Sequence, residues 1–331
     1  MSKDICVVIP TFNRATTLEK TLESILLAEK PEGSRIQIVV VDNNSNDATR
    51  EVCQKFSNEF KGCEYEYVFE EQQGKSYALN TGIQRLKGDL FVCIDDDIEV
   101  DSKWFIEVNE LFSERWEDLD FASGRMLPIW ESDPPEWIEA VKESVLAIRD
   151  YGDEEWVHGM DTPIMTGGHG VMKLDVVREI GMYDVRLGPT GKDLVGCEDD
   201  ALYETLLRNK YRGIYCPKLR FFHFVPSYRL TKKYFRNWNF GAGIGWSLKD
   251  KLIQEYSGRR LLGIPAYLYR EALSGAKYGI ISLIKNSPDS VKEEAKFWTF
   301  AGFLYQSHFS NGLLNTLSSP LKRLALGSVK R

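Results

Sequence analysis

Over its first 225 residues, this chain of 331 alternates between short β-type runs and helical patterns. Strands that alternate with helices are typical of α/β domains, in which right-handed crossovers connect the strands of a mainly parallel sheet. The rhythm therefore predicts such a sheet flanked by helices, in a Rossmann-like arrangement. The expected strands are residues 5–10, 36–42, 65–69 and 90–94, and the expected helices are 16–28, 47–60, 76–86 and 104–112.

Length and cysteine content place the chain in a broad class. Its 331 residues are enough for one large α/β domain with an appendage. None of the six cysteines forms a CxxC pair, and Cys6 and Cys93 lie in apolar runs, where a thiol behaves as a small hydrophobe. We therefore expect neither a disulfide framework nor a zinc site, and a cytoplasmic location. The first residues enter a β-type run at once, which predicts no signal peptide.

Charge is distributed unevenly along the chain. Residues 1–228 contain 25 Lys and Arg against 43 Asp and Glu, whereas residues 229–331 contain 17 against 6. This asymmetry predicts two domains, an α/β domain at 1–228 and a basic, mainly helical region at 229–331. The apolar segments of the basic region are shorter than the ~18–20 residues of a membrane span. Two interpretations stay open: helices lying on the inner face of the cell membrane, or a packed helical subdomain with solvated charges.

Residues 241–245 of the basic region read GAGIG. The spacing partly matches a dinucleotide-binding loop. However, the motif does not follow a clear strand, and no acidic residue stands on a following strand. It therefore favours a helix break or a packing site.

The apolar run at 90–94 ends in three consecutive aspartates, Asp95, Asp96 and Asp97. Open α/β sheets bind their ligands at the carboxyl ends of the strands. Three neighbouring carboxylates repel one another, which is tolerable when solvent or a cation is nearby. Asp95 and Asp97 point to the same side if the backbone is extended. The pattern alone is equally consistent with a divalent-cation site and with an acidic turn.

Polar residues also follow the other expected strands. Arg14 follows the first strand, Asp42 ends the second, and Gly74 and Lys75 follow the third. Asp42 suits a base or ribose, Arg14 and Lys75 suit phosphate charge, and Gly74 permits close backbone approach. Each of these residues alone also suits a helix cap or a turn. Because parallel strands end at one edge of the sheet, together they favour a nucleotide site.

Seven segments, in this order, resemble the successive motifs of family 2 glycosyltransferases. The resemblance covers residues 4–226 and implies the GT-A fold, a nucleotide-sugar donor and inversion at the anomeric carbon. The segments are VVIPTFNR at 7–14, VVVDNNSND at 39–47, GKSYALNTGI at 74–83, CIDDDI at 93–98, TGGHGVMK at 166–173, IGMYDVRLGP at 180–189 and GCEDDALYETLLR at 196–208.

The resemblance assigns the strand ends to a nucleotide sugar. It places Asp42 on the base, usually uracil, Lys75 near the base or the phosphates, and Asp95 toward the ribose. The full set of implied donor-binding residues is Pro10, Thr11, Arg14, Asp42, Lys75, Asp95 and Asp96.

It also implies a metal ion on the diphosphate. Asp97 would ligate Mg²⁺ or Mn²⁺, and His223 falls where some family members supply a further ligand. A divalent cation there would stabilise the negative charge that grows on the leaving diphosphate. Oxygen ligands suit either ion, and the histidine favours Mn²⁺ modestly.

On the acceptor side, the resemblance implies Asp199 as the general base, with Glu198 beside it, and Gly168 and His169 near the acceptor. The base would take the proton of the attacking hydroxyl group. By itself, the run of residues 198–200 also suits an acidic helix N-terminus, and its third acid leaves the assignment open between neighbours.

Taken together, these features predict an inverting glycosyltransferase. Its expected partners are a nucleotide-diphosphate sugar, UDP-linked by expectation, and a glycan or lipid-linked acceptor in cell-surface polysaccharide or glycoconjugate synthesis; nucleic acid is not expected. A sugar nucleotidyltransferase is an alternative, but it calls for a Gly-rich loop after the first strand, and residues 10–14 contain no glycine. A non-catalytic carbohydrate-binding module is a second alternative, but the acidic residues that it would be expected to lose are present.

Overall fold

The computed structural model describes residues 1–309 except 166–167, 169, 192–193, 254–255 and 286–287. The chain forms two compact units. The sheet unit consists of Met1–Ile129, Ile148–Val185 and Glu198–Phe224, and the helical unit of Trp130–Ala147, Arg186–Cys197 and Val225–Arg331. The division into domains at residue 228 stays a prediction, and the compact helical unit additionally takes in two segments from earlier in the sequence.

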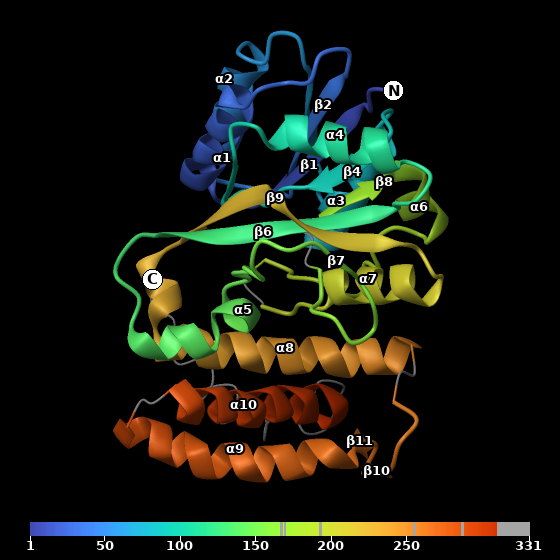
Figure 1. Ribbon diagram of the computed structural model, residues 1–331. Coiled ribbons are helices and arrows are strands. Elements are labelled where there is room, and N and C mark those ends of the chain that lie inside the picture. Colours follow the sequence, from blue (N-terminus) through green and yellow to red (C-terminus); the bar gives the residue numbers. More distant parts are fainter. Residues whose placement is uncertain (166–167, 169, 192–193, 254–255, 286–287, 310–331) are drawn as a thin grey trace. The chain divides into compact units, whose positions relative to one another are not determined.

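Four parallel strands begin the sheet (Figure 1). β1 lies between β2 and β4, and β3 pairs with the outer side of β2. All four expected strands are present, so the α/β class is confirmed. Their bounds are β1 Ile5–Thr11, β2 Ile36–Asp42, β3 Glu64–Phe69 and β4 Leu90–Cys93.

The remaining strands make the sheet a mixed one. The full order is β3-β2-β1-β4-β8-β6-β9-β5, with β7 paired to β9. β8 runs antiparallel to both β4 and β6, while β5 and β7 run antiparallel to β9. These strands are β5 Ile98–Val100, β6 Phe121–Trp130, β7 Trp156–Val157, β8 Gly170–Lys173 and β9 Gly213–Val225.

Both faces of the parallel strands are buried, which explains their continuous apolar sequences. Alternate side chains of β1 point to opposite cores: Ile5, Val7 and Ile9 to one, and Cys6 and Val8 to the other. The first core is covered by α1 (Ala15–Leu27), α2 (Thr49–Ser57) and α4 (Trp104–Arg115), and the second by α3 (Lys75–Arg85), α6 (Leu174–Glu179) and α7 (Glu198–Arg208).

The helical unit is built on three long helices, which confirms the expected helical C-terminal extension. α10 packs against both α8 and α9. Arg236 of α8 donates to buried Glu294 of α10 over 2.7 Å, so this interface joins an ion pair to apolar packing. No helix of the described residues combines the length and the apolar character that crossing a bilayer requires. The elements are η1 Glu136–Ala140, α5 Lys142–Val145, η3 Ser227–Leu230, α8 Lys232–Ile253, β10 Arg260–Leu261, β11 Ile264–Pro265, α9 Ala266–Lys285 and α10 Pro288–His308.

Gly82 allows α3 to lie close to the sheet. A methyl group at this position would lie 2.4 Å from Cγ1 of Val8 and 3.2 Å from Cγ2 of Val41. We expect Gly82→Ala to lower the free energy of unfolding by about 1–3 kcal/mol through overpacking, measured by chemical denaturation. Gln84→Ala, at an exposed position of the same helix, should change it by less than about 0.5 kcal/mol. Equal effects of the two substitutions would contradict the close approach.

Candidate active site

The loops after β1, β2 and β4 meet at one edge of the sheet. Thr11 and Asp42 are opposite each other at the ends of their strands. The hydroxyl of Thr11 donates to the carboxylate of Asp96 over 2.8 Å, which joins the end of β1 to the loop after β4. The structure therefore brings these strand ends together at one edge of the sheet, and their role in binding a nucleotide stays a prediction.

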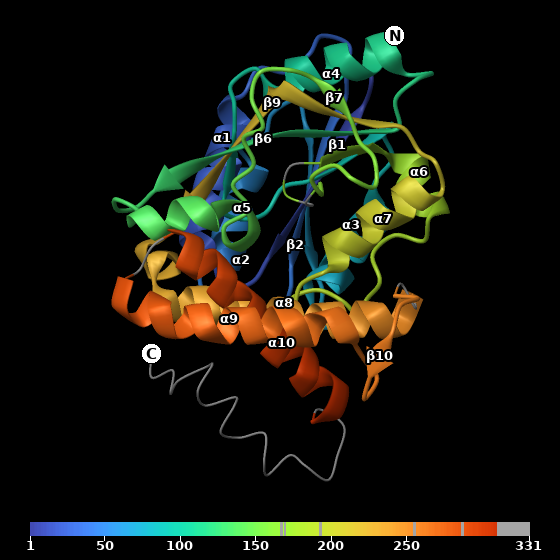
Figure 2. The same cartoon turned by 60° about the horizontal axis from the view of Figure 1, so that its bottom comes forward.

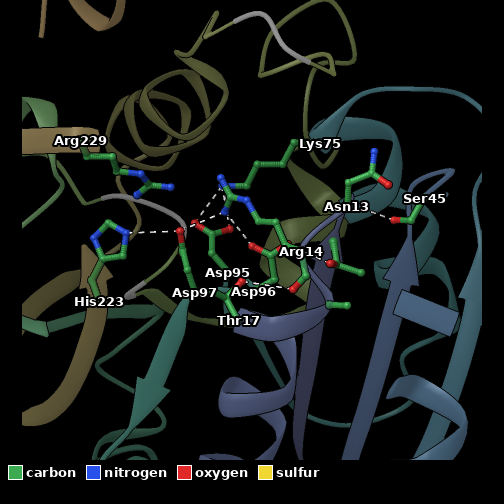
Figure 3. A network of polar contacts seen from close by, with 12 residues as sticks. Asn13, Arg14, Thr17, Ser45, Lys75, Asp95, Asp96, Asp97, His223 and Arg229 are labelled. Atoms are coloured by element: carbon green, nitrogen blue, oxygen red, sulfur yellow. Dashed lines mark hydrogen bonds and ion pairs between the residues drawn. The ribbon is translucent and has the colours of Figure 1, made fainter. Parts of the chain in front are cut away.

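Arg14 links two of the three aspartates. Its Nη1 atom lies 2.8 Å from Oδ1 of Asp96 and 2.9 Å from Oδ2 of Asp97, as the dashed contacts in Figure 3 show. Both carboxylates are buried, whereas the Arg14 side chain is 41% exposed. Burial raises the pKa of Asp96, and the opposing attraction of Arg14 only partly offsets this effect. Arg14 thus holds the aspartate loop and still presents part of its side chain to solvent.

His223 approaches Asp97 from β9. Its Nε2 atom lies 3.5 Å from Oδ2 of Asp97. The pairing of β5 with β9 places His223 opposite Ile98, and the N–H of Phe224 donates to the Asp97 carbonyl over 2.8 Å. This antiparallel pairing brings together two predicted metal ligands that are far apart in the sequence. Within the described residues, no cluster of three or more His, Cys, Asp or Glu side chains forms a complete metal site.

A second group of carboxylates surrounds Lys75. Its ammonium nitrogen lies 2.9 Å from Asp95, 3.6 Å from Glu198 and 4.0 Å from Asp199. Burial alone would lower the pKa of Lys75, but the attraction of these three carboxylates prevails and raises it well above its usual value. Lys75 is therefore a permanent cation between the aspartate loop and the N-terminus of α7.

Glu198 is the most deeply buried member of this group. Burial, together with repulsion from Asp199, raises the pKa of Glu198 to about 8. Ionisation of Glu198 is therefore opposed both by its burial and by the negative charge of its neighbour Asp199.

Gly168 lies beside Asp95. A methyl group there would lie 3.1 Å from Oδ2 of Asp95 and 2.6 Å from Cδ1 of Ile98. The segment implied to face the acceptor therefore reaches the aspartate loop, and a side chain at this point would displace it. His169, predicted for the same side, lies outside the described residues.

Pro10 and Asp42 have structural surroundings of their own. Pro10 is buried in β1 opposite Val41. Asp42 is 2% exposed, and its carboxylate accepts hydrogen bonds from the N–H of Ser45 at 2.9 Å and the hydroxyl of Tyr67 at 2.8 Å. These bonds shape the loop after β2, and contacts of either residue with a nucleotide stay predictions.

Two asparagines organise the site without having been predicted from the sequence. The Asn43 side-chain oxygen accepts from the N–H of Gly74 at 2.7 Å, which fixes the residue before Lys75. Asn80 exchanges two hydrogen bonds, of 2.8 and 2.9 Å, with the backbone of Tyr183. Tyr183 is itself buried, and burial together with the nearby Asp199 raises its pKa. Both asparagines lie inside recognised motifs, but side-chain contacts with backbone leave no periodic signal.

The match to a protein family covers almost half of the chain. Residues 6–157 match the family described as Glycosyl transferase family 2. Glycosyltransferase AglE of Haloferax volcanii is 33% identical over 100 residues, which are 30% of this chain and 32% of that protein. The GalNAc(5)-diNAcBac-PP-undecaprenol beta-1,3-glucosyltransferase of Campylobacter jejuni is 31% identical over 96 residues, 29% of this chain and 30% of its own length. The matched stretch thus spans about a third of each relative.

Solved structures match over nearly the whole chain. The mannosyltransferase PcManGT from Pyrobaculum calidifontis, in complex with GDP-Man and Mn²⁺, has a TM-score of 0.60 and 17% identity over 92% of this chain and 88% of its own. TarS 1–349 of S. aureus, in complex with UDP, has a TM-score of 0.53 and 12% identity over 91% of this chain and 90% of its own. These likenesses show a shared fold, the GT-A fold.

The protonation of Glu198 predicts how stability depends on pH. Between the ordinary pKa of 4.5 and the folded value of about 8, the folded protein holds a proton that the unfolded chain has lost. The free energy of unfolding should therefore fall as pH rises through this window. Glu198→Gln removes the titrating group and should show a flatter profile in urea denaturation from pH 5 to 8. The exposed control Glu154→Gln should follow the wild type; parallel profiles for all three proteins would contradict the raised pKa.

Proposed function

We propose that this protein, whose residues 6–157 match Glycosyl transferase family 2, transfers a sugar from a UDP-linked donor to a hydroxyl group with inversion. The observation that carries the proposal is the arrangement of carboxylates at the sheet edge. Arg14 and His223 approach Asp97, and Lys75 joins Asp95 to the acidic N-terminus of α7. A cation-binding group and a candidate base thus come from separate elements of one unit.

In our proposal Asp97 and His223 hold a divalent cation, because an oxygen and an imidazole nitrogen 3.5 Å apart are donors that suit Mn²⁺, or Mg²⁺ with less preference. Arg14 contacts the same Asp97 oxygen at 2.9 Å, so it would have to release this oxygen when the cation binds. A bound cation would supply positive charge for the leaving diphosphate. The PcManGT complex, which contains Mn²⁺, supports this assignment by its fold.

The donor nucleotide would lie along the loops after β1 and β2. Thr11 and Asp96 are hydrogen-bonded to each other, so in our proposal they shape the floor of this site. Arg14 keeps an exposed part of its side chain for the phosphates, and Asp95 faces the ribose. TarS was solved with UDP and with UDP-GlcNAc, whereas PcManGT was solved with GDP-Man, so the uridine nucleotide of our proposal rests on the resemblance of the sequence motifs and not on the shared fold.

Asp199 is the proposed general base. A base must be ionised before it can take the proton of the acceptor hydroxyl. The ammonium group of Lys75 lies 4.0 Å from the Asp199 carboxylate and favours its ionised form, whereas burial raises the pKa of the neighbouring Glu198. In our proposal Lys75 therefore helps to keep Asp199 ionised and also contacts the donor.

A lipid-linked acceptor fits the surface of the helical unit. Figure 2 shows where β10 and α9 lie. The β10–β11 hairpin exposes Leu261 at 56% and Leu262 at 74%, and the first half of α9 exposes Leu273 at 77%. Exposed cationic side chains stand near them in sequence: Arg259, Arg270 and Lys277. Exposed leucines among cationic groups suit peripheral binding to an anionic membrane. The Campylobacter relative named above acts on an undecaprenol-linked glycan by its name, which supports the same acceptor class.

The catalytic proposal predicts distinct effects for two carboxylates. In a screen that measures UDP, GDP and TDP release with Mn²⁺, the wild type should turn over a UDP-sugar and lose activity in EDTA. Asp97→Asn should lose the metal-dependent rate. Asp199→Asn should lower kcat by about 10²–10⁴-fold while still binding UDP. Asp153→Asn, whose side chain is 91% exposed, is the control and should retain activity; near-normal transfer by Asp199→Asn would exclude it as the base.

The membrane proposal predicts binding to vesicles that contain phosphatidylglycerol, weakening as salt increases. Replacing Leu261 and Leu262 by Ser should reduce the vesicle-bound fraction about tenfold in a sedimentation assay, because two exposed apolar side chains are lost. The matched control is Leu27→Ser in α1, because Leu27 is 80% exposed in the sheet unit. Equal binding by the hairpin variant and the control would refute a membrane role for the hairpin.

A further inference from the structure

The GAGIG motif is part of a continuous helix. Gly241, Gly243 and Gly245 all lie within α8, Lys232–Ile253. The helix break considered from the sequence is therefore wrong, and the packing site is correct. Each glycine costs a helix roughly 1 kcal/mol relative to alanine, so three in five residues call for a packing explanation.

The three glycines face two different neighbours within the helical unit. A methyl group at Gly243 would lie 1.9 Å from the carbonyl oxygen of Thr299 in α10. A methyl group at Gly241 would instead lie 2.1 Å from the carbonyl oxygen of Leu194, and one at Gly245 would lie 2.7 Å from that of Gly196. Residues four apart share one face of a helix, so Gly241 and Gly245 form a single seat for the backbone of residues 194–197.

This segment leads directly to the candidate base. Cys197 is its last residue, and it is followed by Glu198 and Asp199, the first residues of α7. Cys197 adopts φ of +79°, a conformation that costs a non-glycine residue about 1–3 kcal/mol and persists when the surroundings impose it. The Cys197 sulfur also lies close to α8, 2.9 Å from the position that a methyl group added at Gly245 would take.

We propose that Gly241 and Gly245 are positioning residues for the transfer reaction. By admitting the backbone of 194–197 against α8, they hold the residues that directly precede Glu198 and Asp199 in the chain. The inference rests on the proposed role of Asp199 as base. A catalytic group displaced by about 1 Å can lose on the order of 10²-fold in rate. A methyl group added at Gly241 or Gly245 would clash with main-chain atoms, which cannot move aside as a flexible side chain can.

Gly241→Ala and Gly243→Ala make a matched pair. Both add one methyl group to α8 at a similar distance from a carbonyl oxygen, but the first displaces residues 194–197 and the second displaces α10. For Gly241→Ala we expect kcat to fall about 10–100-fold, with the donor KM and the UDP dissociation constant changed less than about twofold. For Gly243→Ala we expect a lower thermal midpoint with kcat per folded molecule retained within about threefold.

A double variant tests whether the seat acts through the base. If it does, Gly241→Ala combined with Asp199→Asn should be little slower than Asp199→Asn alone, because the base is already lost. Multiplied losses in the double variant would overturn the proposal, as would equal losses of kcat in Gly241→Ala and Gly243→Ala. If Gly241→Ala does not fold, Gly245→Ala takes its place, because its closest contact is less severe at 2.7 Å.

The outcomes also separate this inference from the proposed function. A wild-type protein that transfers no sugar from any donor would contradict the function itself. Suppose instead that the wild type is active, Asp199→Asn is inactive and Gly241→Ala is fully active. This result would agree with the proposed function and refute only the positioning role of Gly241 and Gly245.

Discussion

Repulsion among carboxylates at the edge of the sheet is the constraint on which the site depends. Asp95, Asp96, Asp97, Glu198 and Asp199 gather there, and Arg14 and Lys75 each contact more than one of them. The two cations divide the acids into a group beside His223 and a group at the start of α7. Burial raises the pKa of Glu198, so this acid adds less readily to the negative charge. In the function that we propose, the first group holds a divalent cation and the second supplies the base.

The parallel half of the fold could be predicted because its signals are local. Strands buried on both faces leave unbroken apolar runs, as in VVIP and IVVV, and the ends of such strands meet at one edge by geometry. The antiparallel half, β5 to β9, was not predicted because its pairings join distant segments and depend on partners that periodicity does not identify. His223 illustrates the difference: its candidacy came from a family resemblance, whereas its contact with Asp97 comes from the pairing of β9 with β5.

The positions of single side chains were the least predictable part of the site. Lys75 was expected near the base or the phosphates, yet its contacts in the structure are with three carboxylates, two of them from a helix more than a hundred residues later. Asn43 and Asn80 bond mainly to backbone atoms of other loops, so neither composition nor spacing could indicate them. A charged residue near an acidic motif can form ion pairs of similar energy with several carboxylates, and the tertiary fold decides which of these ion pairs form.

The proposed donor side and the proposed base have different structural origins along the chain. The loops after β1, β2 and β4, where we propose that the donor binds, lie entirely within the sheet unit. Asp199 also belongs to that unit, but the residues directly before it, up to Cys197, belong to the helical unit, where glycines of α8 contact their backbone. The candidate base therefore follows directly on a backbone segment that packs against α8, whereas the loops after β1 and β2 are held by hydrogen bonds of their own.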